Sequence, residues 1–507
     1  MKRNKIKRIF ASMLMLLVLV QTGCNKNDND KTENTATVAG ESSSVVTPDL
    51  SAEPVNTAVS TENTENHMST DSAAIVQTAK PTESFETNLP TSAPTASATA
   101  VTHKATASSS VTATAAPSKT ATAVSSSTIT AKKTATPTVE TPKATSTPVV
   151  TDTPYVGEEI TVQSIIDEMT LEEKVAQLFV VVPYALTDIS NANAANETYK
   201  NVFDKYPVGG FCYMGNSIVS ESQVKKMISK SQQYSYDRVG VPLFTCIDEE
   251  GGTVARIGNS GIGVPSVGNM CDIGASGDVS AAKNVGSTIG DYLSEFGFNV
   301  DFAPVADVLS NPDNTVVKKR SFGSDSEIVS DMALAVMRGL EEKGVYGTLK
   351  HFPGHGATEG DTHEGYAYTS KTLEELEKCE LIPFADGIES GADFIMVGHI
   401  SLPNIIGDNT PASLSHKMIT EILREKMGYD GIIITDALNM GAITKQYSSA
   451  EAAVATLLAG SDMILMPDDF VSAYEGVLEA VCDGTVTEKR IDESLERILK
   501  IKLEMMN

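Results

Sequence analysis

The segment that decides the fold is GYDGIIITDALNM, residues 428–440. Its three isoleucines and one threonine form a short β-branched run, which is typical of a strand that is buried on both faces. A carboxylate, Asp436, follows at once. A charged group at the end of a buried strand is costly unless it caps the next helix or takes part in chemistry. The segment therefore predicts a buried strand that ends at a functional edge.

Seven similar apolar runs accompany this one, separated by amphipathic stretches of helical length. The eight expected strands are residues 178–182, 210–214, 243–248, 299–304, 348–352, 394–399, 432–436 and 463–466. Strands that alternate with helices imply parallel crossovers, and eight units over about 350 residues fit a closed barrel better than an open doubly wound sheet. We therefore predict an α/β fold, a single (β/α)8 TIM-type barrel.

Polar residues at the strand ends separate the barrel from the open sheet. A barrel places its chemistry at the carboxyl ends of many strands, whereas an open sheet uses one switch point. Here the polar residues at or just beyond strand ends are Asp248, Asp307, Lys350, His351, His399 and Asp436. Because five strands contribute to one rim, the pattern favours an active site there.

The amino terminus has the pattern of a bacterial lipoprotein signal. Basic residues precede an apolar run at residues 9–20, and Gln21, Thr22 and Gly23 precede Cys24. The run is short for a membrane span. We expect residues 1–23 to be a signal peptide and Cys24 to be lipidated, although Gln21 departs from the usual aliphatic residue. The protein would then be extracytoplasmic, anchored to the membrane only through Cys24, or secreted.

Residues 24–155 are dominated by Thr, Ser, Ala and Pro. Such a stretch cannot bury enough apolar surface to offset its ordering entropy, so we expect a long disordered tether. Whether it carries O-linked glycans stays open. The predicted domains are the signal peptide at 1–23, the linker at 24–155 and the catalytic barrel at 156–507.

Charge and cysteine content exclude two classes of function. The net charge of −27 argues against a nucleic-acid partner, which needs a basic footprint. Five cysteines remain after Cys24, and none of them forms a CxxC pair. An odd number without that spacing indicates neither a zinc site nor a disulfide framework. No metal or other cofactor is expected.

The segment LKHFPGHGATEGDTHEGYAY, residues 349–368, carries three histidines. His351 and His355 have the i, i+4 spacing of helical zinc motifs, but Pro353 and the adjacent glycines make a helix very unfavourable. The alternative involves Asp361 and His363. A carboxylate two residues before a histidine can hold one ring nitrogen and leave the other free for proton transfer. On this pair alone, two unconnected surface residues would be the simpler interpretation.

Two further segments offer groups that could bind a polyhydroxyl ligand. In CIDEEGGTVARI, residues 246–257, two glycines allow a sharp turn that could bring Asp248 and Arg256 to one ligand. In KKRSFGSD, residues 318–325, the Arg320 guanidinium could clamp sugar hydroxyls or an acetamido oxygen. A salt bridge across a loop is the alternative for each. We rank Arg320 above Asp301 for substrate contact.

Together the motifs resemble glycoside hydrolase family 3, in its bacterial β-N-acetylhexosaminidase (β-N-acetylglucosaminidase) branch. The matching strings are DEEGGTVAR, DFAPVAD, RSFG, KHFPGHG with DTH close behind, and TDALNM, in the order of the family. The resemblance implies that Asp436 is the nucleophile, His363 the acid/base and Asp361 its partner. It also implies a non-reducing sugar subsite formed by Asp248, Arg256, Arg320, Lys350 and His351. Relatives often have a second Asp where this chain has Ala437.

The expected function is retaining exo-hydrolysis of terminal β-linked N-acetylhexosamine through a glycosyl-Asp intermediate. The substrate would be a cell-wall or chitin-type oligosaccharide or a muropeptide. A phosphorylase or β-glucosidase of the same family is one alternative, and a non-catalytic sugar-binding lipoprotein is another. The sequence does not decide the oligomeric state, and a monomer is favoured.

Overall fold

The computed structural model describes residues 160–187, 193–363, 365 and 367–506. The expected signal peptide, its lipidation site Cys24 and the expected tether lie outside the described residues. Among the helices of the described part, none has both the length and the apolar character needed to cross a membrane.

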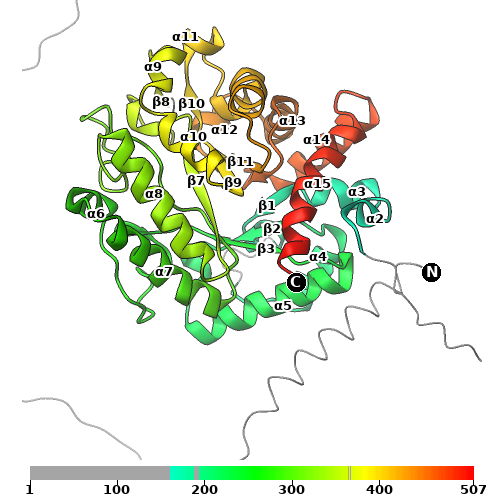
Figure 1. Ribbon diagram of the computed structural model, residues 1–507. Helices are drawn as coiled ribbons and strands as arrows, with labels where there is room; N and C mark the ends of the chain where they lie inside the picture. The colour runs from blue at the N-terminus through cyan, green and yellow to red at the C-terminus, as the bar shows by residue number, and fades with distance from the viewer. Residues whose placement is uncertain (1–159, 188–192, 364, 366, 507) are drawn as a thin grey trace, which may run out of the picture. The chain divides into compact units, whose positions relative to one another are not determined.

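The centre of the described part is an eight-stranded parallel sheet (Figure 1). Its strands are β1 (Phe179–Val181), β2 (Gly210–Cys212), β3 (Phe244–Ile247), β6 (Val300–Asp301), β7 (Tyr346–Phe352), β9 (Phe394–Val397), β11 (Ile432–Thr435) and β12 (Ile464–Leu465). The spatial order runs from β12 through β1 to β11 and otherwise follows the chain. Nearly every strand residue is buried, as expected for a parallel sheet that is covered on both faces.

The expectation of a closed (β/α)8 barrel is wrong at one seam, between β11 and β12. These two strands form no regular ladder and meet at a single parallel bridge between Ile434 and Met463. One cause is a side chain: Thr435 Oγ1 accepts the amide N–H of Leu465 at 3.1 Å, in the place of a backbone carbonyl. The sheet is therefore a nearly closed barrel of the TIM type.

A second side chain also replaces backbone pairing at this seam. The carboxylate of Asp462 is buried and accepts the N–H of Ile433 at 2.9 Å.

Two small sheets lie outside the eight strands. They are an antiparallel hairpin of β4 (Glu249–Gly251) and β5 (Val254–Ala255), and a parallel pair of β8 (Ala367–Tyr368) and β10 (Ile400–Ser401).

Helices surround the sheet (Figure 1). The α-helices are α2 (Val162–Ile166), α3 (Leu171–Ala176), α4 (Glu197–Lys205), α5 (Glu221–Val239), α6 (Met270–Ser276), α7 (Val279–Phe296), α8 (Ser326–Glu341), α9 (Leu373–Glu377), α10 (Ile382–Glu389), α11 (Pro403–Ile406), α12 (Gly441–Thr444), α13 (Ser449–Ala459), α14 (Phe470–Cys482) and α15 (Glu488–Glu504). A π-helix, Lys417–Lys426, lies between β10 and β11.

The long helices begin and end where the sequence supplies caps. Asp278 caps α7 and Asp325 caps α8, each accepting backbone N–H groups of the first turn. α5 and α7 end at Gly240 and Gly297, whose positive φ angles suit a left-handed cap. α7 and α8 pack side by side on the outside of the sheet, where glycines of each helix allow close approach (Figure 1). These helices hold the strands so that the carboxyl ends of all eight face one rim.

Candidate active site

A cavity of about 460 Å³ opens at the carboxyl ends of the strands. It brings together seven of the eight predicted site residues, which are Asp248, Arg256, Arg320, Lys350, His351, His363 and Asp436. The eighth, Asp361, contacts the ring of His363. Apolar side chains complete the wall, among them Met214, Met440 and Met466. Residues that lie more than two hundred positions apart in the sequence, such as Met214 and Met466, therefore meet in one pocket.

Asp436 follows the last residue of β11 and is partly buried. Its backbone N–H donates to Val397 O at 2.9 Å, and its Oδ1 accepts the N–H of Ala437 at 2.8 Å. Burial raises the pKa of this carboxyl, but the neighbouring His351 and His399 rings and the hydrogen bond from the Ala437 N–H outweigh it, so the pKa lies below the usual value. The lowered pKa favours the ionised form of Asp436, which is the form that the expected role requires.

Asp361 and His363 form a pair on the loop that follows β7. Asp361 Oδ1 accepts the backbone N–H of His363 at 2.9 Å and lies 2.8 Å from Nδ1 of its ring. Burial raises the pKa of Asp361, but these two hydrogen bonds hold it below its ordinary value. The ring is 65% exposed, and its Nε2 has no hydrogen-bond partner among the described residues. That nitrogen is free to exchange a proton with a ligand.

The loop that carries Asp361 and His363 contacts α12 and the buried ring of His355. Thr362 O accepts the N–H of Ala442 at 3.1 Å, which ties the loop to α12. The ring of His355 lies 3.4 Å from Thr362 Oγ1, and burial lowers the pKa of that histidine to about 4. A neutral, buried His355 therefore supports the loop from below, and Glu359 and Tyr368 close it by an antiparallel bridge.

Lys350 and Arg320 lie in a network of carboxylates. Lys350 Nζ donates to Asp248 Oδ1 at 2.9 Å and to Glu250 Oε1 at 2.7 Å. Arg320 donates from Nε and Nη2 to the two oxygens of Glu250, both at 2.7 Å. Burial lowers the pKa of Lys350, but the nearby carboxylates of Asp248 and Glu250 raise it by more than burial lowers it. The amine is therefore charged, although the side chain is only 2% exposed.

Arg256 reaches the same cavity from the β4–β5 hairpin. Its Nη2 lies 3.3 Å from Asp248 Oδ2. The turn between the two strands depends on Gly251 and Gly252, whose φ angles are 91° and 56°. A Cβ on Gly252 would lie 2.4 Å from Asn269 Oδ1, so only glycine fits there.

His351 is oriented by a buried carboxylate. Its Nδ1 lies 2.7 Å from Asp307 Oδ2, and its backbone N–H donates to Asp307 Oδ1 at 3.1 Å. Burial raises the pKa of Asp307, and the neighbouring His351 and His355 lower it below the usual value. The ring nitrogen Nε2 of His351 lies 3.3 Å from Arg320 Nη2, at the wall of the cavity. Asp307 thus positions a cavity residue and does not itself line the cavity.

Two other residues at strand ends, Asp301 and His399, do not line the cavity. Asp301 is buried outside the cavity lining, and its Oδ1 accepts the N–H of Glu249 at 2.9 Å. Burial raises its pKa well above the usual value, so Asp301 is a protonated core residue. His399 lies 2.7 Å from Ser413 Oγ and 2.9 Å from Ala437 O, and burial lowers its pKa. A neutral His399 therefore braces the turn that carries Asp436.

Sequence reasoning missed Glu250, which contacts both Arg320 and Lys350. Strand alternation is the signal that could have found it, because Asp248 and Glu250 are two residues apart and share one side of the chain. Glu249 between them faces another way, and its oxygens accept the Tyr292 hydroxyl and two backbone N–H groups. Sequence reasoning also ranked Asp307 and His399 only as strand-end residues, without giving them a role.

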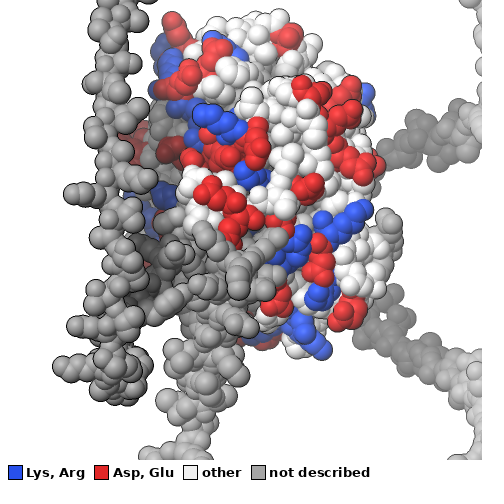
Figure 2. Space-filling view, turned by 90° about the vertical axis from the view of Figure 1, so that its right-hand side faces the viewer, with Lys and Arg blue, Asp and Glu red and all other residues white. Residues whose placement is uncertain are grey.

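Within the described residues, no group of three or more His, Cys, Asp or Glu side chains is arranged to hold a metal ion. The five described cysteines carry free thiols, and Cys212 and Cys246 are buried. Acidic and basic side chains intersperse on the face that Figure 2 shows, and no continuous basic stripe appears among the residues coloured there.

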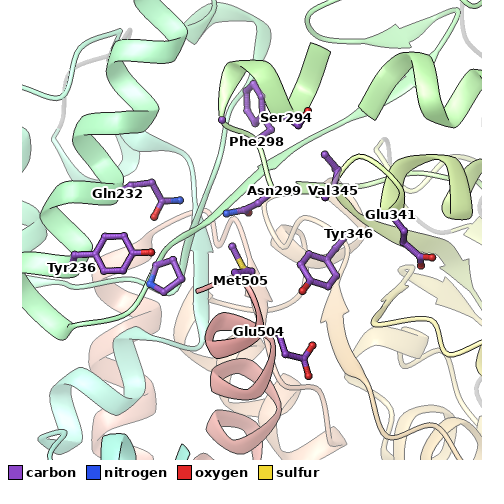
Figure 3. Close-up of a pocket in the computed structure, with 13 residues that line it drawn as sticks. Gln232, Tyr236, Ser294, Phe298, Asn299, Glu341, Val345, Tyr346, Glu504 and Met505 are labelled. Atoms are coloured by element: carbon purple, nitrogen blue, oxygen red, sulfur yellow. The ribbon is translucent and has the colours of Figure 1, made fainter. Parts of the chain in front are cut away.

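A second cavity, of about 580 Å³, lies at the opposite ends of the strands (Figure 3). Asn299 and Tyr346 line it where β6 and β7 begin, and Glu504 and Met505 line it from the end of α15. None of the predicted site residues belongs to it. In a TIM-type barrel the chemistry occupies the carboxyl-end rim, so the first cavity is the candidate active site.

Comparison with known proteins agrees with this geometry. The model of the glycosyl hydrolase family 3 N terminal domain matches residues 170–501. The chain belongs to glycosyl hydrolase family 3. This confirms the family expected from the sequence.

Several family 3 relatives are bacterial. Beta-hexosaminidase A of Pseudoalteromonas piscicida is 34% identical over 329 residues, which are 60% of this chain and 54% of the relative. Beta-hexosaminidase LpqI of Mycobacterium tuberculosis is 32% identical over 342 residues, 65% of this chain and 82% of that protein.

A solved structure, a family 3 β-N-acetylglucosaminidase from Paenibacillus sp. str. FPU-7, is 36% identical with a TM-score of 0.63. The match covers 67% of this chain and 63% of that structure. The chain therefore spans about half of the Pseudoalteromonas relative's length and somewhat under two thirds of the Paenibacillus chain.

Proposed function

We propose that the protein is a retaining exo-β-N-acetylglucosaminidase that hydrolyses terminal β-linked N-acetylhexosamine from cell-wall or chitin-type oligosaccharides. The observation that carries the proposal is one cavity lined by an ionised Asp436 and by the exposed ring of His363, whose Nδ1 is held by Asp361. The names of the relatives, β-hexosaminidase and β-N-acetylglucosaminidase, support the substrate class.

In the first half reaction, Asp436 attacks the anomeric carbon and forms a glycosyl-ester bond as the glycosidic bond breaks. His363 donates the proton from Nε2 to the departing oxygen, so the aglycone leaves as an alcohol. Asp361 compensates the positive charge of the imidazolium before this transfer and holds Nδ1 in place. The exposed position of the ring on its loop suits contact with the leaving group.

In the second half reaction, a water molecule replaces the aglycone. The now neutral His363 takes a proton from this water, whose oxygen attacks the anomeric carbon, and the ester bond to Asp436 breaks. The sugar leaves with retained configuration, and both side chains return to their starting protonation states. A neutral base does not repel an anion, which would suit muropeptide substrates that carry carboxylates.

Sugar binding falls to the other predicted residues that line the cavity. Asp248 can accept hydrogen bonds from sugar hydroxyls, because its side chain is 20% exposed. Arg256, Arg320, Lys350 and His351 supply donors around it. A guanidinium and an ammonium together can bind vicinal hydroxyls or the acetamido oxygen of the sugar.

Activity of the purified full chain on aryl β-N-acetylglucosaminide and aryl β-glucoside, in phosphate-free buffer, tests the substrate class. We expect preference for the N-acetyl sugar, and preference for the plain glucoside would overturn the substrate class. A large rate increase on adding phosphate would indicate phosphorolysis. Sugar binding without turnover would indicate a non-catalytic sugar-binding protein.

Replacement of the nucleophile tests the mechanism. Asp436→Asn should abolish turnover while the protein keeps its affinity for N-acetylglucosamine, because the amide cannot attack the anomeric carbon. Ordinary turnover in this variant would contradict the assignment of Asp436.

We further propose that the protein acts outside the cytoplasm, attached to the membrane through Cys24. The support is the signal-like residues 1–23 ahead of a lone cysteine. Cys24→Ser should shift the protein from the membrane fraction to the medium, measured by fractionation and immunoblotting. Unchanged membrane association would show another anchor.

A further inference from the structure

Glu250 is the point on which two predicted sugar-binding cations converge. Its Oε2 accepts Arg320 Nε at 2.7 Å, and its Oε1 accepts Arg320 Nη2 and Lys350 Nζ, both at 2.7 Å. The Glu250 side chain is 1% exposed, so these bonds lie away from solvent. A bidentate guanidinium–carboxylate pair fixes both distance and orientation. Glu250 therefore determines where the donors of Arg320 and Lys350 point.

We infer that Glu250 is a positioning residue of the sugar subsite, acting through Arg320 and Lys350, and that it keeps Asp248 available to the substrate. This inference rests on the proposed function. It concerns how the subsite is built, and Glu250 takes no part in bond making or breaking.

The charges of the network explain the effect on Asp248. Lys350 lies between two carboxylates, the buried Glu250 and the more exposed Asp248. Glu250 compensates Arg320 and Lys350 from the buried side, so Asp248, whose two oxygens each accept one bond, keeps further lone pairs for sugar hydroxyls. Without the Glu250 charge, Asp248 would be the remaining carboxylate partner of Lys350 among the described residues and would be held more tightly by it. A buried cation that loses a carboxylate partner is strongly unfavourable, and this cost favours the tighter bond to Asp248.

The neighbouring Glu249 shows that Glu250 is not needed simply to hold the loop together. The oxygens of Glu249 accept the backbone N–H groups of Ile257 and Gly258 and the hydroxyl of Tyr292, which fixes the hairpin. Among the described residues, the Glu250 carboxylate bonds only to Arg320 and Lys350. Because the Glu250 carboxylate bonds to two cavity residues, it orients the ligand site and does not hold the backbone around it.

The test compares Glu250→Gln with wild type in the full chain. The amide keeps the volume of the side chain, but its NH2 group meets the donors of Arg320 and Lys350. We expect KM for aryl β-N-acetylglucosaminide and Kd for N-acetylglucosamine, measured by titration calorimetry, to rise at least tenfold. The turnover number should change by less than these constants.

Glu173→Gln is the matched control, because Glu173 is an equally buried glutamate that pairs with Arg238 outside the cavity. It should lower the thermal unfolding midpoint without changing KM or Kd. If Glu250→Gln behaved in the same way, Glu250 would be merely structural and the inference would be overturned. If Glu250→Gln failed to fold, Glu250→Asp would keep the charge and should raise KM less than Arg320→Met does.

A double-mutant cycle tests whether Glu250 acts through Arg320. The variants are Glu250→Gln, Arg320→Met and the two combined. If the effects share one path, the double variant should have nearly the KM of the worse single variant, whereas additive effects would refute the coupling. Wild-type protein that turns over neither aryl substrate would refute the proposed function instead, and the Kd comparison would then still decide the role of Glu250.

Discussion

The buried Lys502 should make the stability of the protein depend on pH in a predictable way. Lys502 lies near the end of α15 with no exposed surface. Its Nζ donates to Gln177 Oε1 and to Gly209 O, both at 2.8 Å, and lies 5.0 Å from the centre of the Phe244 ring. No carboxylate pairs with it among the described residues. Burial without an anionic partner lowers its pKa from 10.5 to about 7.

The sign of the change in unfolding free energy with pH follows from how many protons the folded and unfolded states bind. Between pH 7 and the ordinary lysine pKa, the unfolded chain keeps a proton that folded Lys502 has released, so raising the pH favours the folded state. One pKa unit corresponds to about 1.4 kcal/mol, so the free energy of unfolding should gain about 2–3 kcal/mol from this residue between pH 7 and pH 9.

The comparison with Lys502→Met isolates this contribution, because all other groups titrate alike in both proteins. Urea unfolding followed by far-UV circular dichroism at pH 7, 8 and 9 gives the difference in unfolding free energy. The stability of the variant minus that of wild type should fall by about 2–3 kcal/mol across this range. Lys489→Met is the control, because Lys489 is 84% exposed on the same helix and should give a constant difference. A constant difference for Lys502→Met as well would refute the reasoning.

Two further predictions concern the candidate site. His363→Gln should lower kcat/KM on unactivated disaccharides by about 10²–10⁴-fold and less on aryl glycosides with acidic leaving groups, which need little protonation; equal losses on both would argue against proton donation by His363. Asp307→Asn removes the charged partner of His351 and should raise KM about tenfold by steady-state assay. Because the pKa of Asp307 is lowered, wild type should also lose its stability advantage over this variant as the pH falls below 4, and an advantage that stayed constant would contradict that pKa direction.

The sequence was sufficient for the strands and for most of the cavity. Each barrel strand is a short β-branched or aromatic run. A polar residue at the end of such a strand is energetically costly unless it takes part in the site at the rim. Asp436, Lys350 and His351 were found in this way, and the structure brings them into one cavity. Their chemical roles came from the resemblance to family 3.

The parts that the sequence did not give depend on contacts between distant side chains. The open seam between β11 and β12 arises because Thr435 bonds the backbone of Leu465, thirty residues further on, and no local pattern reports such a bond. Glu250 was hidden for a similar reason. Three acidic residues stand side by side at 248–250, and only the positions of Arg320 and Lys350 show that Glu250 is the one that pairs with both cations.

The seam also sets the order in which the protein can become active during synthesis. The turn that carries Asp436 is bonded to the last strand, since Leu438 N–H donates to Leu465 O and Asn439 N–H donates to Met466 O, at 2.9 and 3.0 Å. Those partners belong to the last of the eight units to leave the ribosome, and domains generally fold as units. The carboxylate at the end of β11 therefore reaches its final place only when the eighth unit arrives. The candidate site is therefore incomplete until the eighth unit has been synthesised.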